Sequence, residues 1–219
     1  SEDWILIHDD IMDNNDKRRG DETLHIKYNL ALAINAGDSL HMVMWGMVYD
    51  AATKLNDKYK DGRGDRFFKK FSDMLITTGE GQFIDVTLTN RKDIADFTME
   101  DYNASIHAKS GYYSVFGPMQ LGMIIAGQPD EAIKKIEEYG SLIGKAFQIK
   151  DDILDCEAFF DAKAAEKLGK KPGNDVWEGT KTAIAYHFYN TSNAPADVKE
   201  KVRQIYMKSL LWATTCIST

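Results

Sequence analysis

The chain contains little cysteine and no long run of apolar residues. Its two cysteines, Cys156 and Cys216, form neither a closely spaced metal-binding pair nor a disulfide framework. This usage fits a reducing compartment, so we expect a cytoplasmic protein. No apolar stretch approaches the roughly 18 residues that a membrane-spanning helix requires. We therefore expect no membrane span.

A block of basic residues is also missing, and the 219-residue chain carries a formal net charge of −7. Nucleic-acid-binding proteins gather lysine and arginine on one surface, because contacts to the phosphate backbone dominate their affinity. We therefore expect no nucleic-acid partner. An anionic substrate would have to be held by locally placed cations or by metal ions.

Proline occurs only four times, and no long stretch alternates apolar and polar residues with a period of two. Apolar residues instead recur at helical spacing. The pattern predicts helices over residues 4–13, 30–55, 66–88 and 98–127, a fifth from the turn at Pro129 to about residue 155, and two short helices at the end. Turns or loops are predicted for residues 14–23, 56–65, 169–180 and 190–197.

No linker-like change of composition divides the chain, and 43% of its residues are hydrophobic, which is enough for one buried core. We predict a single all-α domain over residues 1–219. The chain does not begin with methionine and opens on residues that already have the pattern of a helix. We therefore expect the domain to lack its N-terminal helices.

Two short acidic motifs share the pattern D-D-x-x-D: DDIMD at 9–13 and DDILD at 151–155. On a helix, the first and third aspartates lie on one face. Like charges at that spacing destabilise a helix by about 0.2–0.5 kcal/mol per pair, so a bound cation would offset the repulsion. Mg²⁺ is commonly held by one or two carboxylates together with substrate phosphates. The repeated motif predicts two facing clusters that share magnesium ions around one diphosphate.

Several basic residues lie where they could neutralise the remaining charge of a diphosphate. They are Arg18 and Arg19 after the first motif, Lys109 in HAKSG, Lys170 in GKKPGND and Lys181 in GTKT. Each alone would be an ordinary surface charge. Together they indicate a cradle in which arginine forks and lysine ammonium groups bind phosphate oxygens.

The motifs together resemble those of the trans-isoprenyl diphosphate synthases, the farnesyl and geranylgeranyl diphosphate synthase family. DDIMDNNDKRRG resembles the first aspartate-rich motif with its RRG, FQIKDDILD resembles the second, and GQFID, KSGYY and GKKPGND occur in the family's order. The resemblance spans essentially the whole chain. It implies an isoprenoid synthase type I fold, which is an antiparallel helical bundle around a deep central cavity, usually as a homodimer. It also implies head-to-tail condensation of isopentenyl diphosphate with an allylic diphosphate that ionises with the help of Mg²⁺.

The resemblance assigns metal binding to the six motif aspartates, with about three Mg²⁺ ions per site. It makes three of them direct ligands: Asp9, Asp13 and Asp151. The other three would ligate the metal or support the ligands: Asp10, Asp152 and Asp155. Lys109 and Gln148 join the direct ligands as catalytic residues.

Substrate contacts carry over in the same way. The allylic diphosphate would bind Arg18, Lys109 and Lys170, and isopentenyl diphosphate would bind Arg19. Residues near the reacting carbon would be Gln82, Asp85, Ser110 and Gln148, with Tyr113 matching a family tyrosine in the same region.

Three departures from the family pattern concern the diphosphate sites. An upstream Gly-Lys-x-Arg segment is absent, and Glu2 stands where the family commonly has His or Gln. A glutamate there would repel a diphosphate. Thr180 stands where the family often has lysine. Lys181 is the expected substitute, although one helical step would turn it by about 100°.

Product length depends in this family on the residues four and five before the first aspartate, here Ile5 and Trp4. Ile5 lies one helical turn before Asp9, and Trp4 carries the larger side chain on the flank of that face. We expect geranylgeranyl diphosphate (C20), with farnesyl diphosphate (C15) as the second choice.

Two other functions stay open. One is a class I terpene cyclase, which generally pairs one DDxxD with an N-S-E type motif. The other is a noncatalytic subunit of a heteromeric synthase, a class that often loses aspartates or the RRG. Both acidic motifs and the RRG are intact here, which argues against each alternative.

Overall fold

The structure is a computed structural model that describes residues 2–91, 93–161, 163, 165 and 173–215. Its elements in chain order are α1 (Glu2–Met12), β1 (Lys17–Arg18), β2 (Asp21–Glu22), α2 (Leu24–Lys27), α3 (Leu30–Tyr59), α4 (Arg63–Arg91), α5 (Met99–Ile106), the π-helix η1 (His107–Phe116), α6 (Gly117–Ile125), α7 (Asp130–Phe160), α9 (Asn174–Glu178), α10 (Ala183–Thr191) and α11 (Ala196–Thr215). Apart from the antiparallel β1–β2 ribbon, these described elements are helical. The predicted all-α class is confirmed.

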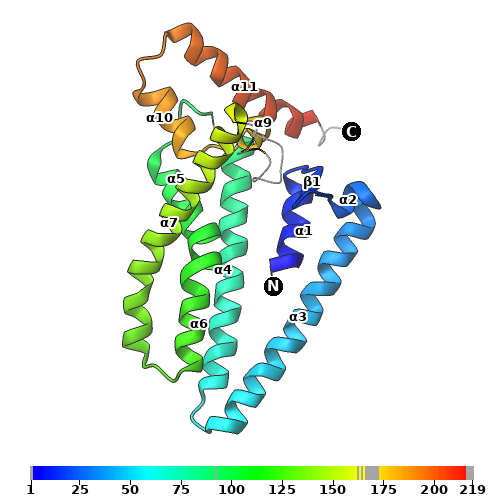
Figure 1. Cartoon of the computed structure of the whole chain (residues 1–219), viewed down its shortest axis with the longest axis vertical. Coiled ribbons are helices and arrows are strands. Elements are labelled where there is room, and N and C mark those ends of the chain that lie inside the picture. The colour runs from blue at the N-terminus through cyan, green and yellow to red at the C-terminus, as the bar shows by residue number, and fades with distance from the viewer. Residues whose placement is uncertain (1, 92, 162, 164, 166–172, 216–219) are drawn as a thin grey trace.

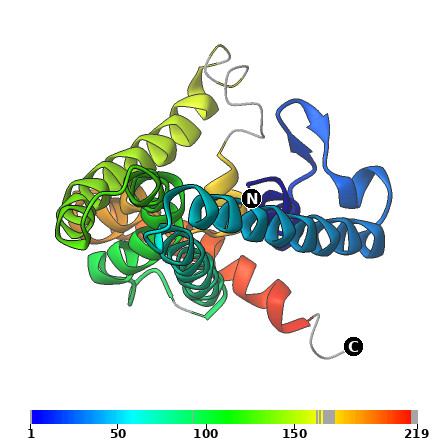
Figure 2. The same cartoon turned by 90° about the horizontal axis from the view of Figure 1, so that it is seen from below.

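The long helices run along the longest axis of the molecule and alternate in direction (Figure 1). α3 runs away from the N-terminal elements, α4 returns, η1 and α6 run back, and α7 returns again. α4 contacts α3, α5, η1 and α6, so it lies at the centre of the bundle. α1 packs on α3, as the view from below also shows (Figure 2). No described helix is long and apolar enough to cross a membrane.

α3 begins and ends on residues that satisfy its free backbone groups. The Asn29 side chain accepts a hydrogen bond from the Leu32 N–H at 2.9 Å, as a helix N-cap does. At the other end Lys60 has a φ of 56°, and its N–H bonds to the Asn56 carbonyl. Gly62, with a φ of 77°, completes the turn into α4. The predicted turn at 56–65 is therefore confined to residues 60–62.

The main core joins α3, α4, η1 and α6. Its buried residues are Met44, Val48, Phe71, Met74, Tyr112, Phe116 and Leu121. α7 approaches η1 closely because two of its residues are glycines. A Cβ at Gly144 would lie 2.4 Å from the Cα of Gly111, and a Cβ at Gly140 would lie 2.0 Å from the Cβ of Phe116. This contact fixes η1 against the helix that carries the second acidic motif.

The single helix predicted over 98–127 is divided into α5, η1 and α6. Its start agrees with the prediction, because Thr98 and Asp101 form the expected capping box. Beyond Ile106 the hydrogen bonds take the wider π pattern, and the last one joins the Gly117 N–H to the Tyr112 carbonyl. π-helical turns are rare and occur frequently at functional sites. Here the π segment contains KSGYY.

Two predicted loops contain short elements, and several helices, α3, α4 and α7 among them, are longer than predicted. Residues 14–23 include the β1–β2 ribbon, and residues 169–180 include α9. Their polar, glycine-rich composition predicts loops, but contacts to distant residues hold Arg18 and Asn174 in these short elements. α7 continues to Phe160, beyond the predicted end near residue 155.

Candidate active site

The first acidic motif lies at the C-terminal end of α1. Asp9 and Asp10 are in the helix. Asp13 follows it, held by a hydrogen bond from its N–H to the Asp9 carbonyl at 2.9 Å. Asp10 is only 5% exposed, whereas Asp9 and Asp13 are half-buried. The first and third carboxylates are therefore more accessible than the second.

Arg18 returns to this motif through the β1–β2 ribbon. Arg19 and Gly20 take φ angles of 54° and 89°, which reverse the chain between the two strands. The Arg18 Nε donates to Asp10 Oδ1 at 2.8 Å, and its Nη2 lies 3.5 Å from Asp9 Oδ2. Burial alone would lower the pKa of Arg18, but the hydrogen bond to Asp10 and the neighbouring aspartate charges raise it. Arg18 is therefore a permanent cation beside the motif.

Arg19 points to a different partner. Its Nη2 donates to Glu2 Oε1 at 2.8 Å, and both side chains are largely exposed. Glu2 is the residue that departs from the family pattern, and it occupies the guanidinium expected to bind isopentenyl diphosphate. Exposed ion pairs typically contribute only about 0–1 kcal/mol, so Glu2 holds Arg19 only weakly.

The second acidic motif lies in the last third of α7, and its middle carboxylate is enclosed. Asp152 is 2% exposed and accepts hydrogen bonds from Tyr102 Oη at 2.6 Å and from Gln148 Nε2 at 2.9 Å. Burial and the bond to Asp152 raise the pKa of Tyr102, so its hydroxyl stays protonated and remains a donor. The second motif is thus braced by α5 as well as by its own helix.

The last carboxylate of this motif holds the start of α9. Asp155 is fully buried, and its two oxygens accept the backbone N–H groups of Asn174 and Asp175, each at 3.2 Å. Asn174 in turn donates from Nδ2 to Asn15 Oδ1 at 3.0 Å. Because Asn15 follows the first motif, α9 connects the two acidic segments.

Two of the predicted residues, Gln82 and Asp85, lie on α4. Gln82 Nε2 donates to Asp9 Oδ1 at 3.3 Å, which joins α4 to the first motif. Asp85, one turn further along, accepts a hydrogen bond from Ser105 Oγ of α5 at 3.1 Å. The structure thus brings Gln82 to the first motif and places Asp85 beside α5.

Lys181 is placed differently from the expectation that it contacts a diphosphate. It is 6% exposed, and its Nζ donates to the Thr89 carbonyl at 2.9 Å. Burial lowers its pKa to about 8, against the opposing effects of Asp93 and Asp85. The Thr180 N–H is also engaged, with the Asp175 carbonyl at 2.8 Å. These bonds do not favour a phosphate contact for Lys181.

The remaining predicted residues differ in how far the structure describes them. Asp151 and Tyr113 are half-buried on α7 and η1. Lys109 and Ser110 lie in η1, and their side chains are outside the described part of the structure. Lys170 lies outside the described residues.

The start of α1 packs an aromatic stack against α3. The Trp4 ring lies 4.3 Å from the His41 ring, with 29° between their planes. His41 Nε2 accepts a hydrogen bond from Trp45 Nε1 at 2.8 Å, and Trp45 packs edge-on against Phe71. Trp4 is thus fixed by two layers of aromatic rings, while Ile5 beside it is half-buried.

The carboxylates offer suitable ligands for a hard cation. Among the described residues, no three His, Cys, Asp or Glu side chains are grouped so that they could hold one ion by themselves. Mg²⁺ commonly takes only one or two carboxylates and completes its oxygen ligands with water and substrate phosphate. One or two aspartate oxygens from each motif would suit this kind of Mg²⁺ coordination.

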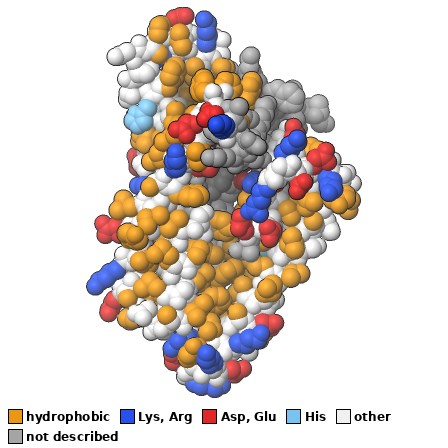
Figure 3. Space-filling model, viewed as in Figure 1, with side chains coloured by type: hydrophobic (Ala, Val, Ile, Leu, Met, Phe, Trp, Pro, Cys, Tyr) orange, Lys and Arg blue, Asp and Glu red, His pale blue; other side chains and the backbone are white. Residues whose placement is uncertain are grey.

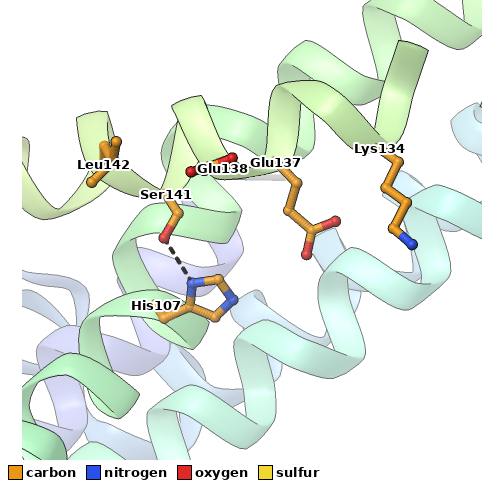
Figure 4. A pocket seen from close by; sticks show the side chains of 6 residues that line it. All are labelled: His107, Lys134, Glu137, Glu138, Ser141 and Leu142. Atoms are coloured by element: carbon orange, nitrogen blue, oxygen red, sulfur yellow. Dashed lines mark hydrogen bonds between the residues drawn. The ribbon is translucent and has the colours of Figure 1, made fainter. Parts of the chain in front are cut away.

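A cavity of about 420 Å³ lies elsewhere, on the surface between η1 and α7. Figure 4 shows His107 and Ser141 facing each other, joined by a 3.1 Å contact between Nδ1 and Oγ. Its other lining residues are Lys134, Glu137, Glu138 and Leu142. Neither acidic motif contributes to this cavity.

A family model described as Polyprenyl synthetase matches residues 3–210, a span that contains both acidic motifs. The chain belongs to the polyprenyl synthetase family. The family resemblance stated from the motifs is confirmed.

The chain is similar to several archaeal proteins of this family. It is 39% identical over 185 residues to the geranylgeranyl diphosphate synthase of Saccharolobus solfataricus, covering 83% of this chain and 51% of that protein. It is 35% identical over 202 residues to the short chain isoprenyl diphosphate synthase of Methanocaldococcus jannaschii, covering 92% and 56%. The crystal structure of geranylgeranyl pyrophosphate synthetase from Pyrococcus horikoshii matches with a TM-score of 0.75 at 30% identity, covering 95% and 61%. The predicted isoprenoid synthase fold is confirmed, and the chain spans about half the length of the first two relatives.

Two residues that hold the second acidic motif in place were not predicted from the sequence. Tyr102 lies outside every quoted motif, and only its position opposite Asp152 reveals it. Asn174 lies inside GKKPGND. That motif was used to predict a role for Lys170, and no role was predicted for its asparagine. Both residues act on partners far away in the sequence.

Proposed function

We propose that the protein is a prenyltransferase that condenses isopentenyl diphosphate head-to-tail with an allylic diphosphate. The observation that carries the proposal is the division of the six motif aspartates by burial. Three are buried at 5%, 2% and 0% exposure and bonded to protein donors: Asp10, Asp152 and Asp155. Three are half-buried: Asp9, Asp13 and Asp151.

This division supports distinct roles in binding Mg²⁺. The half-buried Asp9, Asp13 and Asp151 would be the direct ligands. The buried aspartates would hold the motif backbones in place, because they are enclosed by the protein and their oxygens accept hydrogen bonds there. When bound, Mg²⁺ would neutralise charge on the diphosphate oxygens.

The chain's own cations would stabilise the leaving group. In the reaction, the allylic carbon–oxygen bond breaks and its electron pair leaves with the diphosphate. The double bond of isopentenyl diphosphate then forms the new carbon–carbon bond, and a proton is lost. Arg18, Lys109 and Lys170 would counter the charge that develops on the diphosphate. Arg19 would bind isopentenyl diphosphate after Glu2 is displaced.

Product length would be set at the start of α1. A prenyl chain that runs back from the Asp9 end of this helix meets Ile5 and then Trp4 on the preceding turn. The Trp4 ring stacks on His41 at a distance of 4.3 Å. Moving Trp4 away from a growing chain would therefore break this stacking. We place geranylgeranyl diphosphate first and farnesyl diphosphate second.

A homodimer is part of this proposal. α3 buries only a narrow stripe, and large apolar residues on its other sides are exposed, including Val43 at 59% and Met47 at 68%. Hydrophobic side chains also cover much of the lower half of the face in Figure 3. Monomeric proteins rarely expose apolar surface so widely. Light scattering after size exclusion tests this, and a monomer at micromolar concentration would contradict it.

The Glu2–Arg19 ion pair favours one second candidate, a noncatalytic subunit of a heteromeric synthase, because it occupies the arginine assigned to isopentenyl diphosphate.

Product analysis separates the candidates. The protein is incubated with Mg²⁺, isopentenyl diphosphate and each allylic primer in turn, and the dephosphorylated alcohols are chromatographed. A synthase yields longer alcohols only when both substrates are present. A cyclase releases hydrocarbon from the allylic substrate alone, and a noncatalytic subunit yields neither.

A further inference from the structure

One hydrogen bond joins the turn after the first acidic motif to the start of α9, which is itself bonded to the second motif. Asn174 Nδ2 donates to Asn15 Oδ1 at 3.0 Å, across 159 residues of sequence. Asn15 is tied to the first motif, because its N–H bonds to the Asp10 carbonyl at 2.9 Å. A movement of Asn15 therefore moves the turn that carries Asp13.

Asn174 is tied equally firmly to the second motif. Its backbone N–H donates to Asp155 Oδ1 at 3.2 Å, and the preceding residue, Gly173, donates to the Asp155 carbonyl at 3.3 Å. Asn174 is 9% exposed, and its amide group also donates to Glu178 Oε1. Its Nδ2 is thus held by acceptors on both sides and has little freedom to rotate.

We propose that Asn15 and Asn174 are positioning residues that set the separation of the two acidic motifs and so tune the affinity for Mg²⁺ with diphosphate. This inference rests on the proposed function. Figures 1 and 2 show α9 between the end of α7 and the C-terminal end of α1. The two motifs carry like charges and repel each other until cations arrive. The bridge holds them together beforehand, which reduces the ordering that ligand binding must supply.

The test compares Asn15→Ala, Asn174→Ala and the double variant with the wild type. Isothermal titration calorimetry measures Mg²⁺ binding in the presence of inorganic diphosphate, a probe that cannot react. Loss of one neutral hydrogen bond changes an equilibrium constant by about 2- to 12-fold, and we expect weakening in that range. The double variant should bind no more weakly than Asn174→Ala, because Asn174→Ala already removes the bond to Asn15 along with the one to Glu178. Asn193→Ala, at an exposed loop asparagine, is the matched control and should bind like the wild type.

Thermal unfolding without ligand is measured for every variant. A lowered melting temperature with unchanged Mg²⁺ affinity would mean a purely structural role and would overturn the proposal. Additive weakening in the double variant would also overturn it, since the two asparagines would then act separately. If Asn174→Ala does not fold, the Asn15→Ala variant alone decides the test. Asn15 is only half-buried, so we expect its substitution to leave the fold intact. The condensation assay on the wild type keeps the two ideas apart: affinity shifts in an enzyme that makes no product would refute the proposed function and leave the bridge standing.

Discussion

Replacing Tyr102 with phenylalanine removes one buried oxygen and leaves the ring that packs α5 in place. Tyr102 Oη donates to Asp152 Oδ2 at 2.6 Å, while Gln148 donates to the other oxygen of the same carboxylate at 2.9 Å. The substitution therefore removes one of these two donors and creates no large cavity. Its effect reports how strongly α5 braces the second motif.

The magnitude follows from burial. Tyr102 is 5% exposed and Asp152 is 2% exposed, so bulk water cannot replace the lost donor. Hydrogen bonds to charged groups typically contribute about 1.5–3 kcal/mol. We expect Tyr102→Phe to lower the free energy of unfolding by about 2 kcal/mol. For a chain of this length, that loss lowers the melting temperature by about 4–8 °C.

Urea denaturation followed by circular dichroism measures the change. Tyr139→Phe on α7 is the matched control, because Tyr139 is 57% exposed and its hydroxyl can bond to water in either state. The control should unfold within about 0.5 kcal/mol of the wild type. If Tyr102→Phe is as stable as the wild type, the hydroxyl does not brace Asp152, and α5 does not hold the second motif through this bond.

Three further predictions concern metal, product and pH. Asp9→Ala and Asp151→Ala should each lower turnover by orders of magnitude with circular dichroism unchanged, and EDTA should abolish wild-type activity; near-normal activity in either variant removes that carboxylate from the metal site. Trp4→Ala should give products longer by at least one five-carbon unit in chromatography of the dephosphorylated alcohols, and an unchanged length means that the pocket ends elsewhere. For Lys181, burial lowers the pKa to about 8 from its ordinary value of 10.5, so the unfolded chain binds more protons between those values and stability rises with pH there. Relative to Lys181→Met, the wild-type free energy of unfolding should rise by about 1.3 kcal/mol from pH 7 to pH 9 in urea titrations, and parallel curves would refute the lowered pKa.

Local patterns predict the elements of this fold well where neighbours in sequence determine them. The helical spacing of apolar residues places α1, α3, α4 and α7, and the Thr98 capping box marks the start of α5. The π-helix does not follow from any local pattern, because it depends on Gly144 of α7 meeting Gly111. In the same way, Lys181 follows the motif and was expected at the diphosphate, but the carbonyl of Thr89 at the end of α4 receives its amine.

The two acidic motifs have the same pattern but not the same structure, and the ends of their helices explain why. α1 ends at Met12, so Asp13 lies in the turn and stays half-buried. α7 continues to Phe160, so Asp155 lies inside a helix, where α9 covers it and takes both of its oxygens. The spacing places the first and third aspartates of each motif on one face, but in the second motif Asp151 is half-buried while Asp155 is fully buried. Asp155 already accepts two backbone N–H groups, whereas Asp13 lies in a turn, so we expect the last aspartates of the two motifs to have different roles. Under the proposed function, the first motif would therefore offer two half-buried carboxylates to a cation, and the second would offer one, while Asp155 holds the start of α9.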